Sequence, residues 1–374
     1  MRAVAVFPND KTIKVIDDHP EPALDRDTDV LLQMVDVGVC GTDKEICRFD
    51  YGIPPAGSPY LVIGHESLGQ VARVGSAVTR VKPGDLVVTM VRRPCSDASC
   101  RACRSGRQDF CFTGGFTERG IKGRHGFMTE RVVEDQQYMH VVPLHLRNVG
   151  VLVEPLTIAE KALIQVWDVQ ERLPWTAPGS APGDAGHGQK AVVLGAGPVG
   201  LLGALALIVR GFDTWVYSRD GETSPAAEWT ASVGAHYVSS QTATVSQLAA
   251  KAGNIDLVYE ATGASGLSFQ MIEVLGVNGV FCFTGVPGRK APISIDADLL
   301  MRNMVLKNQL VFGTVNAGSD AFAAAVSDLA QFHARWPQQV ESLITGRFAA
   351  NAAIDLLTGP GRGIKNVVTF HQNA

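Results

Sequence analysis

Short apolar segments separated by glycine and proline dominate the chain from residue 30 to about residue 142. Residues 30–35 and 86–90 are two such segments, and residues 81–85, with Pro83 and Gly84, form a turn before the second. Apolar runs of this length bounded by turn residues are typical of β-strands. We therefore expect a mostly β first part, followed after Pro155 by a helix with apolar side chains at residues 158, 159, 162, 163, 166 and 167.

The pattern changes to alternating strand-like and helix-like segments after residue 188. Residues 191–194 predict a buried strand, residues 198–210 predict an apolar helix, and residues 214–217, 255–259 and 279–283 predict further strands. Such alternation is typical of a parallel sheet with helices on both faces. Residues 176–188 are rich in glycine, alanine and proline, which indicates an exposed loop at a domain boundary. Another helix is predicted near residues 320–332.

Length and composition indicate a globular enzyme of two domains. The chain has 374 residues, 46% of them hydrophobic and 19% charged. Its net charge of −4 favours neither nucleic-acid nor anionic-membrane binding. The N-terminus lacks the features of a signal peptide, and the longest apolar run, residues 199–209, is shorter than the roughly 20 residues of a membrane helix. We therefore expect a cytoplasmic protein.

Four cysteines lie close together in the first part of the chain: Cys95, Cys100, Cys103 and Cys111. Four thiolates at such spacing are typical of a structural zinc site with tetrahedral all-cysteine coordination. Two local disulfides or free thiols are the alternatives. Disulfide frameworks belong mainly to short secreted chains, whereas this long chain has seven cysteines, an odd number. We favour zinc in a reducing compartment.

A glycine motif follows the predicted strand 191–194 and opens the apolar helix. It reads Gly195-Ala196-Gly197-Pro198-Val199-Gly200. Here the first glycine permits a tight turn, the second lets the backbone approach a pyrophosphate, and the third lets helix and strand pack closely. The helix N-terminus offers free N–H groups to the phosphates. An ordinary glycine-rich turn is the alternative, but the flanking strand and helix favour dinucleotide binding.

The end of the next predicted strand selects the cofactor. Ser218 falls at its tip and Arg219 follows, and both residues suit the 2′-phosphate of NADP. Asp220 is the rival, because a carboxylate would instead bind the ribose 2′-hydroxyl of NAD. We favour NADP over NAD.

Cys40, His65 and Glu66 stand where apolar segments give way to glycine-containing turns, and Glu154 opens the helix predicted after Pro155. Thiolate and imidazole are well matched to zinc, and a carboxylate can complete the ligand set. Each residue taken singly is better explained as a core or surface residue. Their occurrence together with a dinucleotide site favours a catalytic metal.

The order of these motifs resembles the zinc-dependent medium-chain dehydrogenase/reductase superfamily over nearly the whole chain. Several segments are similar to its glucose 1-dehydrogenase branch: Gly64-His65-Glu66-Ser67-Leu68-Gly69, Phe116-Thr117-Glu118-Arg119-Gly120-Ile121-Lys122-Gly123, His125-Gly126-Phe127-Met128, Val153-Glu154-Pro155-Leu156, Tyr217-Ser218-Arg219 and Gly313-Thr314-Val315-Asn316-Ala317. These segments are more specific than the glycine motif.

The resemblance implies an α/β fold in which a GroES-like β-rich catalytic domain is split around a Rossmann domain with a doubly wound parallel sheet. We expect the catalytic domain over residues 1–175, with residues 313–374 returning to it, and the Rossmann domain over residues 176–312. The resemblance implies catalytic zinc on Cys40 and His65, with Glu66 and Glu154 bound directly or through water. It also implies a homo-oligomer, either a dimer or a tetramer.

The implied reaction is oxidation of an aldose at C1 to the aldonolactone, with D-glucose favoured over D-galactose or another aldose and hydride transfer to NADP or NAD. Glu118, Glu154 and Asn316 are expected to contact the sugar, and Thr42 to lie near the reacting hydroxyl. The remaining cofactor contacts are expected from Thr284, Gly285, Val286, Val315 and Asn316. A zinc-dependent alcohol or polyol dehydrogenase is the alternative, followed by a zinc-free reductase and a non-catalytic nucleotide sensor on the same scaffold.

Two features depart from the family pattern. The first gap between the clustered cysteines has four residues where two are usual, and Val91 stands where the family has a sugar-contacting asparagine. A valine cannot hydrogen-bond a hydroxyl. Occupancy of the structural zinc site and the identity of the preferred sugar therefore stay open.

Overall fold

The computed structural model describes residues 1–174, 185–288, 292–361 and 363–371, and the chain forms two compact units. The first unit comprises Met1–Thr157 and Asn316–Ala374, and the second comprises Ile158–Val315. These limits differ from those predicted at 175/176 and 312/313. The first limit falls inside helix α3 (Val153–Gln170), whereas composition pointed to the later loop at residues 176–188, most of which lies outside the described residues.

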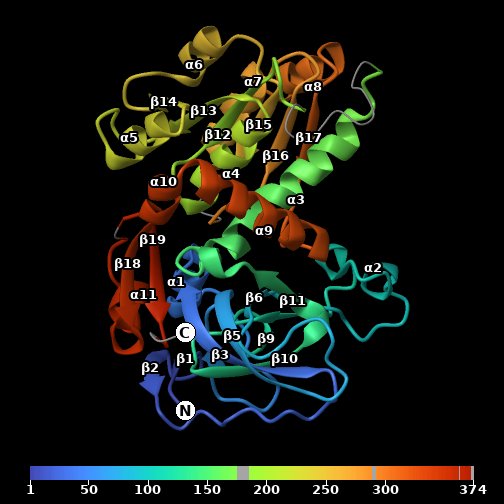
Figure 1. The fold of residues 1–374 in the computed structure, drawn as a ribbon. Helices are drawn as coiled ribbons and strands as arrows, with labels where there is room; N and C mark the ends of the chain where they lie inside the picture. Colours follow the sequence, from blue (N-terminus) through green and yellow to red (C-terminus); the bar gives the residue numbers. More distant parts are fainter. Residues whose placement is uncertain (175–184, 289–291, 362, 372–374) are drawn as a thin grey trace. The chain divides into compact units, whose positions relative to one another are not determined.

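A seven-stranded sheet dominates the first unit (Figure 1). Its strands follow the order β11-β6-β5-β3-β19-β18, and β10 also pairs with β3; smaller sheets have the orders β2-β1-β4 and β7-β8-β9. The mostly β character predicted for this part is thus present. The strands are β1 (Ala3–Phe7), β2 (Thr12–Ile16), β3 (Asp29–Gly38), β4 (Leu61–Val62), β5 (Glu66–Val74), β6 (Leu86–Thr89), β7 (Arg92–Arg93), β8 (Thr117–Arg119), β9 (Gly123–Arg124), β10 (Arg131–Asp135), β11 (Met139–Val142), β18 (Ile344–Ala349) and β19 (Lys365–Thr369).

The C-terminal segment returns to the first unit through β19. This strand pairs antiparallel with β3, where Val367 lies opposite Gly38. On its other side β3 pairs antiparallel with β5, where Gly38 lies opposite Glu66. Because β3 is central, almost all its side chains are buried, among them Leu32 and Met34. The pairing brings two strands that are far apart in sequence to the same end of β3.

The helices of the first unit are mostly short. They are α1 (Gly41–Cys47), α2 (Arg101–Arg104), α9 (Ser319–Arg335), α10 (Pro337–Ser342) and α11 (Ala353–Thr358), with the first residues of α3. The predicted helix at residues 320–332 corresponds to α9. Helix α3 begins two residues before Pro155. A proline is tolerated in the first turn, because the N–H that it lacks would have no partner within the helix there.

The second unit is built on a six-stranded parallel sheet with the order β14-β13-β12-β15-β16-β17 (Figure 1). In sequence order this is 3-2-1-4-5-6, the doubly wound arrangement of dinucleotide-binding domains, so the predicted sheet is confirmed. The strands are β12 (Lys190–Leu194), β13 (Asp213–Ser218), β14 (His236–Ser239), β15 (Leu257–Glu260), β16 (Val280–Phe283) and β17 (Leu310–Gly313), and the helices are α4 (Pro198–Val209), α5 (Pro225–Ser232), α6 (Val245–Ala252), α7 (Ser265–Val274) and α8 (Ala297–Leu306).

Helices cover both faces of this sheet because strand side chains alternate between faces. Val192 and Val258 join a buried cluster with residues of α6, α7 and α8. Tyr259, the next residue after Val258, faces α4 instead, where a Cβ on Gly203 would lie 2.4 Å from its ring. No helix among the described residues combines the length and apolar character needed to cross a bilayer.

Candidate active site

Cys40, His65 and Glu66 lie together in the first unit. Cys40 follows β3 and immediately precedes α1, and His65 and Glu66 stand where β5 begins. A thiol sulfur, a ring nitrogen and a carboxylate oxygen from the three residues lie within 4.8 Å of one another. The pairing of β3 with β5 explains this convergence, since it places the end of one strand beside the start of the other. Three of the four predicted ligands of the catalytic metal are therefore neighbours.

Asp43 organises this group from inside α1. Its side chain is fully buried, and it accepts the Cys40 N–H at 2.9 Å and the Gly64 N–H at 3.2 Å. Its Oδ1 also lies 3.4 Å from His65 Nδ1. Burial alone would lower the pKa of His65, but the Asp43 carboxylate raises it well above its ordinary value. Asp43 was not among the predicted site residues, although its position three residues after Cys40 is a helix-capping signal.

Lys365 pairs with Glu66 in the interior. Its Nζ lies 2.7 Å and 2.6 Å from the two carboxylate oxygens of Glu66 and 3.3 Å from the Val39 carbonyl oxygen. Both side chains are at most 2% exposed. A Cβ on Gly38 would lie 2.0 Å from Glu66 Oε2, so glycine is required beside this pair. Lys365 was not among the predicted site residues, because a lone lysine in an apolar strand carries no recognisable signal.

Glu154, the fourth predicted ligand, is the second residue of α3 and is buried, but it is not within ligand distance of the other three. Burial raises the pKa of Glu154 to about 7; the His65 ring opposes this rise and the Glu66 carboxylate adds to it. Thr42, two residues after Cys40, is the partly buried second residue of α1.

Glu118 and Asn316, two predicted sugar contacts, are joined by a hydrogen bond in which Asn316 Nδ2 donates to Glu118 Oε1 at 3.0 Å. Glu118 is 5% exposed, and Arg92 binds the same oxygen, with Nη2 at 2.9 Å and Nε at 3.0 Å. Asn316 has a φ of 61°, the left-handed conformation that asparagine tolerates better than most residues. Arg92 was not among the predicted site residues.

The four clustered cysteines converge. One sulfur atom from each of Cys95, Cys100, Cys103 and Cys111 lies within 4.8 Å of the others. The sulfur atoms of Cys100 and Cys111 are 3.8 Å apart, far from disulfide length and close to the about 3.8 Å expected for two thiolates bound tetrahedrally at about 2.3 Å from one zinc ion. None of the four is in a disulfide. The widened first gap is thus compatible with a four-sulfur site.

The glycine motif of the second unit forms a tight strand-to-helix turn. Gly195 has a φ of 101°, and a Cβ on Gly200 would lie 2.0 Å from the Gly195 carbonyl oxygen. Pro198 is the first residue of α4, and Val199 follows it. A Cβ on Gly197 would meet no protein atom within 4 Å, so protein packing does not require glycine there. A glycine at this position leaves room for a ligand to approach the backbone closely.

Ser218 is the last residue of β13, as expected, and Arg219 and Asp220 follow it on the surface. The backbone carbonyl of Arg219 accepts a hydrogen bond from Gln241 Nε2 at 2.8 Å, which fixes the turn after the strand. Val286 and Val315, two further predicted cofactor contacts, are 78% and 54% exposed.

Glu260 ties together two loops at the carboxyl ends of the parallel strands. Its fully buried carboxylate accepts the N–H groups of Thr262 and Gly263 at 2.6 Å and 2.8 Å, and that of Gly285 at 3.1 Å. The hydroxyl of Thr284, a predicted cofactor contact like Gly285, donates to the Glu260 carbonyl oxygen at 2.6 Å. Glu260 was not among the predicted site residues, although an acidic residue at the end of an apolar strand is a recognisable signal.

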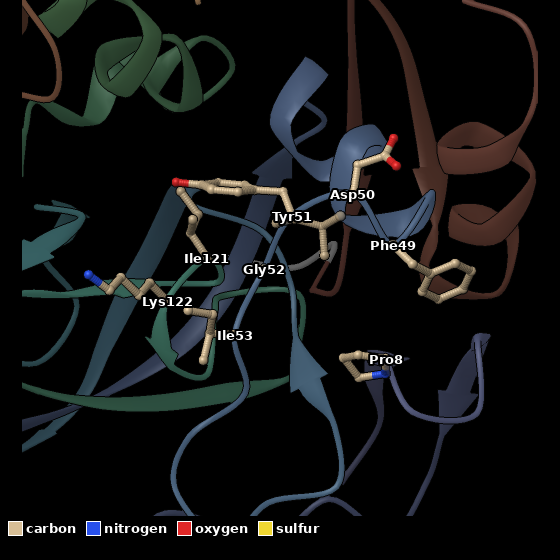
Figure 2. A pocket seen from close by; sticks show the side chains of 9 residues that line it. Pro8, Phe49, Asp50, Tyr51, Gly52, Ile53, Ile121 and Lys122 are labelled. Atoms are coloured by element: carbon tan, nitrogen blue, oxygen red, sulfur yellow. The ribbon is translucent and has the colours of Figure 1, made fainter. Parts of the chain in front are cut away.

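A cavity of about 310 Å³ opens on the first unit beside α1. Figure 2 shows Tyr51, Ile53, Ile121 and Lys122 on one side of it and Phe49 and Pro8 on the other. The Ile53 N–H donates to the Ile121 carbonyl oxygen at 2.9 Å, which joins the two segments of this wall. Burial raises the pKa of the Tyr51 hydroxyl, and the Glu118 charge raises it further.

Comparison with known proteins identifies similar chains. A family model described as "Glucose dehydrogenase C-terminus" matches residues 147–370, and one described as "Alcohol dehydrogenase GroES-like domain" matches residues 26–144. A glucose 1-dehydrogenase of Methanocella arvoryzae is 36% identical over 98% of this chain and 99% of its own length. A glucose 1-dehydrogenase of Thermoproteus tenax is 38% identical over 88% of each chain.

A solved structure of Haloferax mediterranei glucose dehydrogenase, in complex with NADP, Zn and gluconolactone, covers 100% of both chains with 30% identity and a TM-score of 0.86. An alcohol dehydrogenase of Thermus sp. ATN1 shares the fold, with 22% identity, 99% coverage of both chains and a TM-score of 0.76. The GroES-like character expected for the first unit is therefore confirmed.

Proposed function

Because this chain belongs to the zinc-dependent medium-chain dehydrogenase/reductase superfamily, in its glucose 1-dehydrogenase branch, we propose that it oxidises an aldose at C1 to the aldonolactone and transfers the hydride to NADP. D-glucose is the favoured aldose, with D-galactose and other aldoses as alternatives, and NAD is the alternative acceptor. The likeness to glucose 1-dehydrogenases along almost the whole chain carries this proposal.

The donor set of the first unit fits a zinc ion, because thiolate, imidazole and carboxylate are its usual protein ligands and their atoms lie within 4.8 Å of one another. Cys40, His65 and Glu66 would hold the ion, with Glu154 binding directly or through water. When bound, zinc acts as a Lewis acid that makes the anomeric hydroxyl more acidic. A second zinc would occupy the four-cysteine site, where it would fix the surrounding loop.

The chain's own side chains orient the sugar and move its proton. Glu118 and Asn316 would bind ring hydroxyls, and buried polar groups of this kind reject substrates that leave them unpaired. Thr42 would accept the anomeric proton and pass it toward solvent. Asp43 would orient the His65 ring, because its carboxylate lies 3.4 Å from Nδ1 and is held in place by the Cys40 and Gly64 N–H groups.

The second unit would hold the nicotinamide cofactor. The pyrophosphate would lie against Gly195, Gly197 and the first turn of α4, whose N–H groups have no partner within the helix. Ser218 and Arg219 would bind the 2′-phosphate, which favours NADP. Glu260 holds Thr284 and Gly285 in the neighbouring loop. Hydride transfer requires the nicotinamide ring and the sugar C1 to meet, with the protein supplying their orientation.

The protein is proposed to form a homo-oligomer built on the β17 edge. Among the described residues β17 pairs only with β16, and the side chains of Met301, Val305 and Leu306 on nearby α8 are largely exposed. An unpaired strand edge next to apolar side chains suits pairing with a second copy about a two-fold axis. A cytoplasmic location is proposed because four clustered, unbridged cysteines suit a reducing compartment.

One experiment tests the function: purified protein is assayed for reduction of NADP and NAD with D-glucose, D-galactose, D-xylose, sorbitol and ethanol, and zinc is measured on the same sample. Activity with aldoses, preference for NADP and about two zinc ions per chain are expected. Turnover of sorbitol or ethanol but no aldose would indicate the polyol or alcohol dehydrogenase alternative. A protein that binds NADP and turns over nothing would contradict an enzymatic role.

A further inference from the structure

Arg92 and Glu118 are direct neighbours across two short antiparallel strands. In the pairing of β7 with β8, Arg92 lies opposite Glu118. Side chains alternate along a strand, so the next residues, Arg93 and Arg119, point to the other face. There both arginines bind the buried Glu134, with contacts of 2.6 Å and 2.9 Å. One face of this strand pair is thus a closed ion cluster, and the other carries the Arg92–Glu118 pair.

The donors around Glu118 converge on one of its two carboxylate oxygens. Arg92 Nε, Arg92 Nη2 and Asn316 Nδ2 all lie within 3.0 Å of Oε1. Among the described residues, no hydrogen bond reaches Oε2. A carboxylate oxygen can accept more than one hydrogen bond, so Oε2 is left to accept a hydroxyl from a bound molecule.

Arg92 is itself held rigidly by the four-cysteine lobe, residues 95–111. Its Nη1 donates to the Asp109 carbonyl oxygen at 3.2 Å, and its backbone carbonyl oxygen accepts from Gln108 Nε2 at 3.5 Å. The guanidinium lies 3.7 Å from the centre of the Phe116 ring. A planar group fixed by hydrogen bonds and by stacking has little rotational freedom left.

We propose that Arg92 is a positioning residue for sugar recognition, which holds the Glu118 carboxylate so that Oε2 accepts a ring hydroxyl of the aldose. This inference rests on the proposed function. Arg92 does not touch the substrate; it occupies Oε1 from two nitrogens and so fixes the carboxylate plane. A lysine would keep the positive charge but could not supply two nitrogens in this fixed geometry, nor stack on Phe116.

The test is a double-mutant cycle with D-glucose as the probe, or the aldose that wild type uses best. Arg92→Lys, Glu118→Gln and the double variant are compared in KM for sugar, KM for NADP and kcat. Arg124→Lys is the matched control, because Arg124 lies in β9 of the same small sheet, is 41% exposed and does not contact Glu118. Melting temperatures confirm that each variant is folded.

Arg92→Lys is expected to raise the KM for sugar about tenfold or more, with the KM for NADP changed less than about twofold, since a hydrogen bond to a charged group is worth roughly that much affinity. In the double variant the KM for sugar should be no higher than in Glu118→Gln alone, because Arg92 acts only through Glu118. Arg124→Lys should behave as wild type. If Arg92→Lys does not fold, Phe116→Leu should raise the same KM several-fold, and Glu118→Gln should abolish that effect.

The proposal would be wrong if the effects of Arg92→Lys and Glu118→Gln on the KM for sugar multiplied in the double variant. It would also be wrong if Arg92→Lys raised the KM for sugar and the KM for NADP equally. Both results are expected of a purely structural residue. A wild type that reduces NADP with no aldose would overturn the proposed function as well. The two failures are thus distinguished by the wild-type assay alone.

Discussion

Replacing Lys365 by methionine should destabilise the first unit strongly. The substitution keeps the length and apolar stem of the side chain but removes the ammonium group that lies 2.7 Å and 2.6 Å from the oxygens of Glu66. In the zinc-free protein, Glu66 would remain as a carboxylate only 1% exposed, without a counter-ion. Burial alone would lower the pKa of Lys365, but the Glu66 charge raises it, so the amine is charged at neutral pH. The contribution of the ion pair to stability is therefore lost only at strongly alkaline pH.

The magnitude follows from the burial of the pair. Removing one partner of a buried ion pair costs about 3–5 kcal/mol, because the other charge stays desolvated and unpaired. In a unit of roughly 200 residues each kcal/mol lowers the melting temperature by about 2–4 °C, so a decrease of roughly 6–20 °C is expected. Replacing both partners, as in Lys365→Met with Glu66→Gln, should restore most of the loss, because no buried charge is then left unpaired.

Thermal unfolding of chelator-treated, zinc-free samples, followed by circular dichroism at pH 7.5, provides the assay, because zinc held by Glu66 would itself act as a counter-ion. Lys82→Met is the matched control, because Lys82 pairs with Asp85 at the same 2.7 Å but is 80% exposed. Exposed pairs contribute about 0–1 kcal/mol, so this variant should melt close to wild type. If zinc-free Lys365→Met melted at the same temperature as zinc-free Lys82→Met, the reasoning from burial would be wrong.

Three further predictions concern other parts of the chain. The melting temperature should fall as the pH drops from about 6.5 toward 4. Burial lowers the pKa values of His125 and His140 to about 4, so the unfolded chain binds protons at a higher pH than the folded protein does. The fall in melting temperature should be smaller in His125→Gln. Cys111→Ser should reduce zinc from about two ions per chain to about one and raise the KM for sugar more than the KM for NADP, because the lobe that holds Arg92 loses its metal; unchanged metal content would contradict the four-sulfur site. Met301→Glu should lower the particle mass in light scattering by placing a charge in the proposed contact between copies, and an unchanged mass would exclude α8 from that contact.

The second unit was predictable from the sequence because its signals are local. The glycine motif, the strand before it and the helix after it are contiguous, and the structure gives β12, the Gly195 turn and α4 at almost the predicted residues. The tip of β13 at Ser218 was likewise readable from one short apolar run. The limits of the two units could not be predicted in the same way, because the first boundary lies inside α3, where the apolar spacing is regular and the composition does not change.

In the first unit the chain itself supplied the candidate ligands, since Cys40, His65 and the four clustered cysteines are chemically distinctive wherever they occur. Which basic side chains hold the carboxylates of the site was decided only by the tertiary structure. Lys365 reaches Glu66 because β19 pairs with β3 across more than half of the sequence, and Arg92 reaches Glu118 because two short strands align in register. Lysine and arginine look like ordinary surface residues in a sequence, and only burial next to a carboxylate, which depends on long-range strand pairing, turns them into parts of a site.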